Sequence, residues 1–410
     1  MKYAIILSGI LVILFGLVAC HKNNNPVPAK KDTTVTSTVA ADSATGIFIL
    51  TGTNDSIGEV NSLFFYNPDG TLRWKRDANS WQEFGTPGYA NGTVYLSTLS
   101  VQWDGVPRQS SYAAWEELYA LDASDGSVKW SYVDSNYAYA TPAADSGEIY
   151  LPQQGFIQGF DAHTGLPNWS AVVANGLTWT PLIDGDTLFT ATAPLYTGYY
   201  NITAVDTKTG QTFWTTPIGY NPPAGILMTG GNLVFSTGSG ALMAVDRGSG
   251  AIVWSVQDQQ YGSMHVAGGN SLFTFNTYSP VSLYAFSLAT GGQFWQANLP
   301  FTPSQIGGVW MYGKNVCYYI YDYPNDHLQT ANPQTGDTVS RVSANGRYED
   351  PLLVGHRIYA RKIWNNTTLL ATPQLAILDA GSLAVKDSAV ITGVQQIISM
   401  HVIGSSGAIY

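Results

Sequence analysis

The stretch ALDASDGSVKW, residues 120–130, decides the fold because copies of it recur along the chain. AVDTKTGQTFW follows at residues 204–214 and AVDRGSGAIVW at residues 244–254, so the shared pattern is Ala-x-Asp-x-x-x-Gly-x-x-x-Trp. Looser copies lie between and after these three. The repeat residues to which we assign structural roles are Asp122, Gly126, Trp130, Asp161, Gly165, Trp169, Asp206, Gly210, Trp214, Asp246, Gly250, Trp254, Gly291 and Trp295.

The spacing of the repeat predicts its architecture. The tryptophan positions are 74, 130, 169, 214, 254 and 295, with Ser340 in the seventh, so units are 39 to 45 residues apart except for one interval of 56. A period near 40 is typical of propeller blades or helical arrays. Short runs of Val, Ile, Leu, Phe and Tyr between Gly-containing turns favour four strands, A to D, in each unit. We predict an all-β fold, a single β-propeller of eight blades, or of seven if the weak copy around Asp379 forms none.

The ends of the chain predict how the ring closes. The first unit begins at strand B, Gly46 to Leu50, whereas an unpaired stretch resembling strand A lies near the end, at Ile397 to Ile403. We expect these two strands to share one blade, because closure removes exposed sheet edges. Within the repeat, Asp should bond turn amides, Gly should allow the positive φ of a tight turn, and Trp should wedge between neighbouring blades.

Residues 1–20 predict export. Lys2 precedes an apolar run that ends in Leu17-Val18-Ala19-Cys20 and is too short for a stable membrane span. The segment resembles a bacterial lipoprotein signal, which implies that Cys20 carries diacylglyceryl and palmitate groups; a chance cysteine after an ordinary signal is the alternative. Residues 21–44 are polar and contain two prolines, as in a flexible tether, and residues 45–410 form the propeller.

Composition argues against several classes of function. The net charge of −10 disfavours nucleic acid, which requires a basic face. Beyond Cys20 the chain has one cysteine, Cys317, so no disulfide can form within the mature domain. The six histidines show no metal-ligand spacing, and no catalytic, cofactor-binding or metal-binding residue is predicted.

The repeat phrase, with Thr-Pro and Gly-x-Val-Tyr strands before it, resembles the pyrroloquinoline-quinone-like (PQQ-like) β-propeller repeat family. That family includes quinone-dependent alcohol dehydrogenases and a non-enzymatic lipoprotein branch with the lipoprotein of the outer-membrane β-barrel assembly machine, which the chain also resembles in layout. The resemblance implies that an enzymatic member would have a disulfide between adjacent cysteines and a calcium-binding set of Glu, Asn and Asp. This chain has no adjacent cysteines. Candidate carboxylates include Asp322, Asp326, Glu349 and Asp350, but their spacing in the sequence requires neither a metal site nor an acid/base pair.

Aromatic residues gather in the connections from strand B to strand C and from strand D to the next strand A, which must share one face of the ring. Tyr220 and Tyr278 are among them, and the predicted partner-binding residues are Trp81, Trp103, Tyr112, Trp115, Trp179, Tyr199, Tyr321 and Trp364. The alternative is that these rings pack the long loops onto the propeller. We predict a monomeric, lipid-anchored scaffold for protein partners at the outer membrane, in outer-membrane protein assembly. The alternatives are a glycan-binding surface lipoprotein and a quinone-dependent dehydrogenase.

Overall fold

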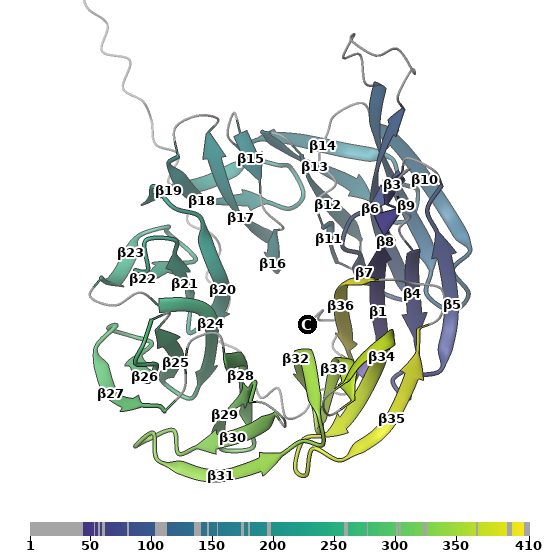
Figure 1. Cartoon of the computed structure of the whole chain (residues 1–410). Coiled ribbons are helices and arrows are strands. Elements are labelled where there is room, and N and C mark those ends of the chain that lie inside the picture. The colour runs from purple at the N-terminus through teal and green to yellow at the C-terminus, as the bar shows by residue number, and fades with distance from the viewer. Residues whose placement is uncertain are drawn as a thin grey trace, which may run out of the picture.

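The computed structural model describes residues 44–405 apart from short gaps at 53, 56–57, 60–61, 80–81, 103–112, 135–140, 146, 154, 174–175, 179–180, 195–197, 258–260, 277, 301, 303–304, 323–325, 366–367 and 392–395. Eight four-stranded antiparallel blades form a β-propeller, so the eight-bladed prediction is confirmed. Figure 1 shows the blades around a ring, with the first strand of each nearest the centre. Among the described residues, no helix is long and apolar enough to cross a membrane.

Each blade orders its strands A to D from the centre outward. Blade 1 contains β36 (Gln396–Gly404), β1 (Ala44–Gly52), β4 (Ser62–Tyr66) and β5 (Leu72–Asp77), with a small hairpin of β2 (Asn54–Asp55) and β3 (Gly58–Glu59). Blade 2 contains β6 (Gln82–Phe84), β7 (Gly88–Ala90), β8 (Thr93–Gln102), β9 (Ala113–Asp122) and β10 (Val128–Asp134), where β6 and β7 both pair with β8 and share the role of strand A. Blade 3 contains β11 (Ala143–Ala144), β12 (Glu148–Gln153), β13 (Phe156–Asp161) and β14 (Pro167–Val172).

The next blades repeat the arrangement. Blade 4 contains β15 (Gly176–Thr178), β16 (Leu182–Asp184), β17 (Thr187–Pro194), β18 (Tyr200–Asp206) and β19 (Thr212–Gly219), with a divided strand A as in blade 2. Blade 5 contains β20 (Pro223–Thr229), β21 (Asn232–Thr237), β22 (Leu242–Asp246) and β23 (Ile252–Val256). Blade 6 contains β24 (Tyr261–Gly268), β25 (Ser271–Asn276), β26 (Ser282–Ser287) and β27 (Gln293–Asn298).

The last two blades complete the ring. Blade 7 contains β28 (Ile306–Tyr312), β29 (Asn315–Ile320), β30 (His327–Ala331) and β31 (Thr338–Ser343). Blade 8 contains β32 (Arg347–Val354), β33 (Arg357–Asn365), β34 (Thr368–Asp379) and β35 (Val385–Val390). The predicted closure is confirmed: β36 pairs antiparallel with β1, with Ile47 opposite Val402 and Ile49 opposite Met400.

The hydrophobic core lies between the blades. Each of eight buried clusters joins two adjacent blades; Phe273 and Val281 of blade 6 belong with Val316 and Tyr318 of blade 7, for example. Strands B and C are buried on both sides, as in β21, where every residue is buried. Strand D alternates, because one of its sides faces solvent. Each blade is therefore stabilised by the blade before it and the blade after it.

Candidate binding face

The order of strands gives the ring two faces. The A to B and C to D turns lie on one, here called the AB/CD face, and the B to C and D to A connections lie on the other, the BC/DA face. All described A to B turns are tight, as at Gly230-Gly231 and Gly269-Asn270, where Gly230, Gly231 and Gly269 have positive φ.

On the AB/CD face, the repeat tryptophans join each blade to the next. The indole N–H of Trp254 donates to the carbonyl oxygen of Leu288 in the following C to D turn, at 2.9 Å. The same bond recurs from Trp74 to Ala123, Trp130 to Ala162, Trp169 to Thr207, Trp214 to Arg247 and Trp295 to Pro333, at 2.8 to 3.1 Å. The predicted wedge between blades is thus a hydrogen bond as well as a packing contact.

The repeat Gly and Asp complete this contact. Gly250 has φ +73°, and a Cβ there would lie 2.6 Å from the indole of Trp214, so its side is covered by the preceding tryptophan. The Asp246 carboxylate accepts the backbone N–H of Ser249 at 2.8 Å and holds the turn that presents this glycine. The repeat residues on this face therefore have a structural role.

Two of the eight junctions lack the tryptophan. In blade 7, Ser340 occupies its position and shares a hydrogen bond with Thr330 at 2.7 Å. In blade 8, the guanidinium of Arg357 donates instead to the carbonyl oxygen of Pro68 in blade 1, at 3.2 Å. The Ser340 bond stays within blade 7, so blade 8 has the indole contact at neither of its junctions.

On the BC/DA face, the B to C connections of blades 8, 1 and 2 contain additional β-pairing. In blade 2, the β8–β9 ladder continues to the pair of Gln102 and Ala113. The inner strand β6 pairs with β8 only as far as Ser100, and the outer strand β10 pairs with β9 only as far as Glu116. In blade 8, β33 and β34 remain paired as far as Asn365 opposite Thr368, although the outer strand stops at Gln374. In blade 1, β2 and β3 form their own hairpin. These three connections, here called the projecting hairpins, belong to blades that are neighbours in the ring (Figure 1).

Six of the eight predicted partner-binding aromatic residues have side chains outside the described part of the structure. Trp115 and Trp364 lie on the projecting hairpins, opposite Ser100 and Leu369, but their side chains are outside the described residues. Trp81, Trp103, Tyr112 and Trp179, like Cys20, also lie outside the described residues. Their roles stay predictions.

Tyr199 and Tyr321 are described, and they differ. Tyr199 is 46% exposed and its ring contacts, at a tilt, the ring of Tyr220, which is 62% exposed. Tyr321 is partly buried: its ring packs over Gly307 and 5.7 Å from the ring of Tyr319, and burial raises the pKa of Tyr321 to about 12. Tyr321 therefore has the geometry of a packing residue, whereas Tyr199 keeps about half of its surface exposed to solvent.

Charged side chains gather where blades 7 and 8 meet this face. Asp326 is fully buried, and its carboxylate accepts the backbone N–H groups of Tyr348 at 2.7 Å and Asp322 at 3.1 Å. Burial raises the pKa of Asp326 to about 6. The backbone of Ala344 donates to the carbonyl oxygen of Asp326 at 2.7 Å, so Asp326 fastens the B to C connection of blade 7 to the start of blade 8.

Arg361 was not predicted from the sequence, and it organises the neighbouring carboxylates. Its guanidinium pairs with Glu349 at 3.4 Å and contacts the carboxylate of Asp350. It also donates to the carbonyl oxygen of Ile397 in blade 1 at 2.8 Å, and so joins blade 8 to the closing strand. The ladder pairing of Glu349 with Arg361 would have revealed this contact, but that register is not readable from the sequence.

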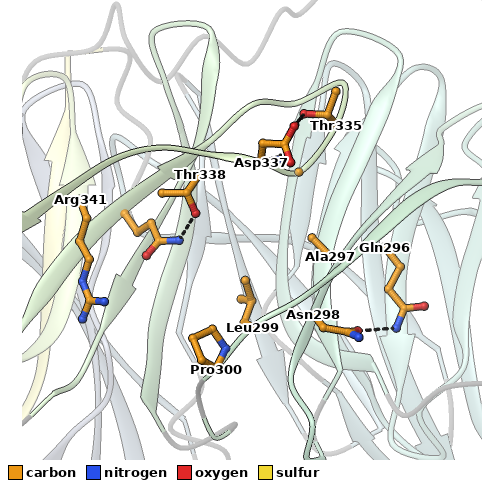
Figure 2. Close-up of a pocket in the computed structure, with 11 residues that line it drawn as sticks. Gln296, Ala297, Asn298, Leu299, Pro300, Thr335, Asp337, Thr338 and Arg341 are labelled. Carbon is orange, nitrogen blue, oxygen red and sulfur yellow. Dashed lines mark hydrogen bonds between the residues drawn. The ribbon is translucent and has the colours of Figure 1, made fainter.

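An open groove of about 580 Å³ lies on the outer side of the junction between blades 6 and 7 (Figure 2). Amide and hydroxyl groups line it, and they bond one another: Gln296 to Asn298 at 3.2 Å, Gln329 to Thr338 at 2.8 Å. Asp337 accepts the hydroxyl of Thr335 at 2.7 Å. These polar groups of the lining are therefore already paired with one another.

The described residues do not fit the quinone and calcium site of the enzymatic branch. Cys317 lies on β29, is fully buried, and has a pKa raised to about 12 by burial, so it cannot supply a cysteine pair at the centre. Within the described part of the chain, no group of three or more His, Cys, Asp or Glu is placed to hold a metal ion.

The family model described as outer membrane protein assembly factor BamB matches residues 32–256. The chain belongs to this family. The PQQ-like propeller expected from the repeat phrase is therefore confirmed.

The relatives of this BamB-family chain include proteins with different names. It is 24% identical over 265 residues to BamB of Shewanella oneidensis, covering 60% of this chain and 64% of that protein. It is 23% identical over 356 residues to tetrathionate hydrolase of Acidithiobacillus ferrooxidans, covering 75% of this chain and 68% of that protein. Among solved structures, BamB from Moraxella catarrhalis aligns with a TM-score of 0.54 at 19% identity over 78% of this chain and 94% of that one. Dihydro-heme d1 dehydrogenase NirN aligns with a TM-score of 0.57 at 12% identity, over 86% of this chain and 74% of that one. Likenesses at this level of identity show the fold.

Proposed function

We propose that this chain is a non-enzymatic scaffold of the bacterial cell envelope that docks a protein partner on its projecting hairpins, in the assembly of outer-membrane proteins. The family match and the relatives named BamB support the scaffold role. The observation that carries the docking surface is the adjacency of three B to C connections with additional β-pairing on blades 8, 1 and 2.

The chemistry of these hairpins suits a protein interface. Trp103, Tyr112, Trp115 and Trp364 belong to them in sequence, and interfaces concentrate Trp and Tyr because such rings bury a large area at modest entropic cost. The paired strands of blade 2, as far as Gln102 opposite Ala113, are already ordered by their ladder and need not be ordered on binding.

The non-enzymatic part of the proposal rests on the lack of fit between the described residues and the quinone and calcium site. Tetrathionate hydrolase and dehydrogenase relatives show that the fold also supports catalysis. A thermal-unfolding assay with added quinone and calcium distinguishes a scaffold from a quinone-dependent enzyme, because ligand binding to the native state must raise the melting temperature. We expect no shift; a shift that depends on both additions would favour the enzyme.

The docking proposal is tested with a shortened hairpin. Replacing residues 101–114 by Asn-Gly would join Ser100 to Trp115 through a two-residue turn and remove the tip of blade 2 while leaving the blade itself. We expect capture of outer-membrane assembly proteins from a detergent extract to fall roughly tenfold or more. The double variant Trp103→Ala and Trp115→Ala should act in the same direction.

Phe294→Ala is the matched control, since Phe294 is a 55% exposed aromatic residue on the outer strand β27. It should leave capture unchanged. Capture that survives the shortened hairpin at wild-type level would contradict docking at this site.

The anchor is a separate part of the proposal. We infer that Cys20 is acylated and holds the propeller at the outer membrane. Metabolic labelling with a palmitate analogue should mark the wild type and not Cys20→Ser, which should leave the membrane fraction. Equal labelling of both proteins would refute it.

A further inference from the structure

The BC/DA face of blades 4 to 6 is almost free of charge. Between Thr187 and Tyr321 the sequence has six charged residues, Asp206, Lys208, Asp246, Arg247, Asp258 and Lys314. Five of them lie at or beside C to D or A to B turns, on the opposite face, and Asp258 is the single one in a BC/DA connection. Most residues of the connections are Tyr, Asn, Gln, Ser, Thr, Gly and Pro, as in Gly219-Tyr220-Asn221-Pro222, and Leu195, Asp258, Leu299 and Phe301 are also present. This neutral sector contrasts with blades 7 and 8, where Asp322, Glu349 and Arg361 meet the same face.

Two tyrosines stand together in the neutral sector. Tyr199 comes from the B to C connection of blade 4 and Tyr220 from the D to A connection that follows. Their ring centroids are 3.9 Å apart, the ring planes meet at 37°, and the two hydroxyls are in hydrogen-bond contact. Both rings keep roughly half of their surface exposed, at 46% and 62%. The pair therefore presents an aromatic surface to solvent although its members already contact each other.

Backbone hydrogen bonds hold this surface in place. Gly238, in the B to C turn of blade 5, donates to the carbonyl oxygen of Pro222 at 3.0 Å. A Cβ at Gly238 would lie 2.8 Å from Asn221, so the two connections are in close contact. Tyr261 in turn donates to the carbonyl oxygen of Gly240 at 3.1 Å, which links the next connection. Because these bonds already order the connection that carries Tyr220, a ligand would not have to order it.

The chemistry of the sector matches one class of ligand. Exposed aromatic rings offer an apolar surface with a polar hydroxyl at the edge, and Asn201 and Asn221, both partly exposed, lie beside the two tyrosines in sequence. A sugar ring has the complementary character, with apolar C–H faces and hydroxyls around its rim. An anionic polymer would lose hydration here with no Lys or Arg in the connections to replace it.

We propose that the Tyr199–Tyr220 pair and the neutral connections around it bind an uncharged polysaccharide. This site is distinct from the projecting hairpins and goes beyond the scaffold role, since it gives the propeller a second ligand of different chemistry. A protein partner on the same sector is the competing occupant, and the experiment separates the two.

The test is affinity electrophoresis of the full-length mature protein in native gels that contain one polysaccharide each. The probes are laminarin, amylopectin, hydroxyethyl cellulose and mannan as neutral chains, and polygalacturonate as the acidic one. We expect retardation in at least one neutral gel and none in polygalacturonate. The double variant Tyr199→Ala and Tyr220→Ala should lose the retardation, with an apparent dissociation constant raised roughly tenfold or more. Phe294→Ala is the aromatic control and should migrate like the wild type.

Three outcomes would overturn the proposal. One is the absence of retardation in all four neutral gels. Another is retardation that the tyrosine double variant retains while its circular dichroism spectrum and melting temperature match those of the wild type. The third is loss of protein capture, without any polysaccharide binding, when both tyrosines are replaced, which would assign the sector to a protein partner.

Discussion

On the AB/CD face, six tryptophans repeat one contact: an indole N–H bonds the next C to D turn, and the ring covers a turn glycine. On the BC/DA face, the connections vary from projecting hairpins on blades 8, 1 and 2 to short turns on blade 5. The difference shows where stability and recognition are encoded. The indole contact that repeats between blades lies on one face, so the connections of the other face can change length and chemistry without removing it.

The largest expected effect comes from breaking one tryptophan contact. Trp254 is 7% exposed and donates to Leu288 of the next blade at 2.9 Å. Trp254→Ala should lower the free energy of unfolding by about 3–5 kcal/mol, since it removes a large buried ring and leaves a cavity between blades. Guanidinium chloride denaturation measures the loss. A change below about 1 kcal/mol would show that the junction does not depend on this ring.

A pair of glycine variants separates backbone strain from the tryptophan contact. Gly250 and Gly269 both have positive φ, but a Cβ at Gly250 meets Trp214 at 2.6 Å whereas a Cβ at Gly269 meets nothing within 4 Å. Gly269→Ala should lose about 1 kcal/mol from the backbone conformation. Gly250→Ala should lose roughly 1–3 kcal/mol more from overpacking. Equal losses of stability for the two variants, measured by the same denaturation assay, would show that the Trp214 ring adds nothing to the cost of a Cβ at Gly250.

On the other face, the buried Asp326 predicts a pH dependence. Its pKa is raised by burial to about 6 in the folded protein, above the ordinary value of 3.8. The protonated side chain thus favours folding, and its stabilising contribution is full below about pH 3.8 and lost as pH rises through about 6. After allowance for screening, this is about 1–2 kcal/mol between pH 4 and 7.5.

The measurement is denaturation of the wild type and Asp326→Asn at both pH values. The wild type should lose more stability than the variant as pH rises, because the amide does not titrate. Identical pH dependence in the two proteins would contradict a raised pKa at this site.

The smallest expected effect is at Tyr220, which is 62% exposed. Tyr220→Ala should change the free energy of unfolding by less than about 0.5 kcal/mol, because an exposed ring on a connection contributes little to the core. Thermal unfolding next to Trp254→Ala gives the comparison directly. A loss comparable to that of Trp254→Ala would make Tyr220 a structural residue.

The AB/CD face could be predicted from the sequence because its contacts are local and periodic. Asp122, Gly126 and Trp130 recur at fixed spacing, so one copy explains the others, and the strand-A-like end of the chain predicted the closure with β1. The BC/DA face is different. The contact of Tyr199 with Tyr220 and the pairing of Arg361 with Glu349 depend on connections from separate strands, and no repeat fixes their geometry. The sequence placed the aromatic residues on this face but could not tell the exposed Tyr199 from the packed Tyr321.

Site-specific photo-crosslinking in cells tests the division between the two faces most directly. A photoreactive amino acid at Trp103, on the BC/DA side, is compared with one at Lys208, an exposed residue of a C to D turn. The account predicts crosslinked adducts with envelope proteins from position 103 and none from position 208. Adducts from position 208 alone, or of equal yield from both, would contradict it.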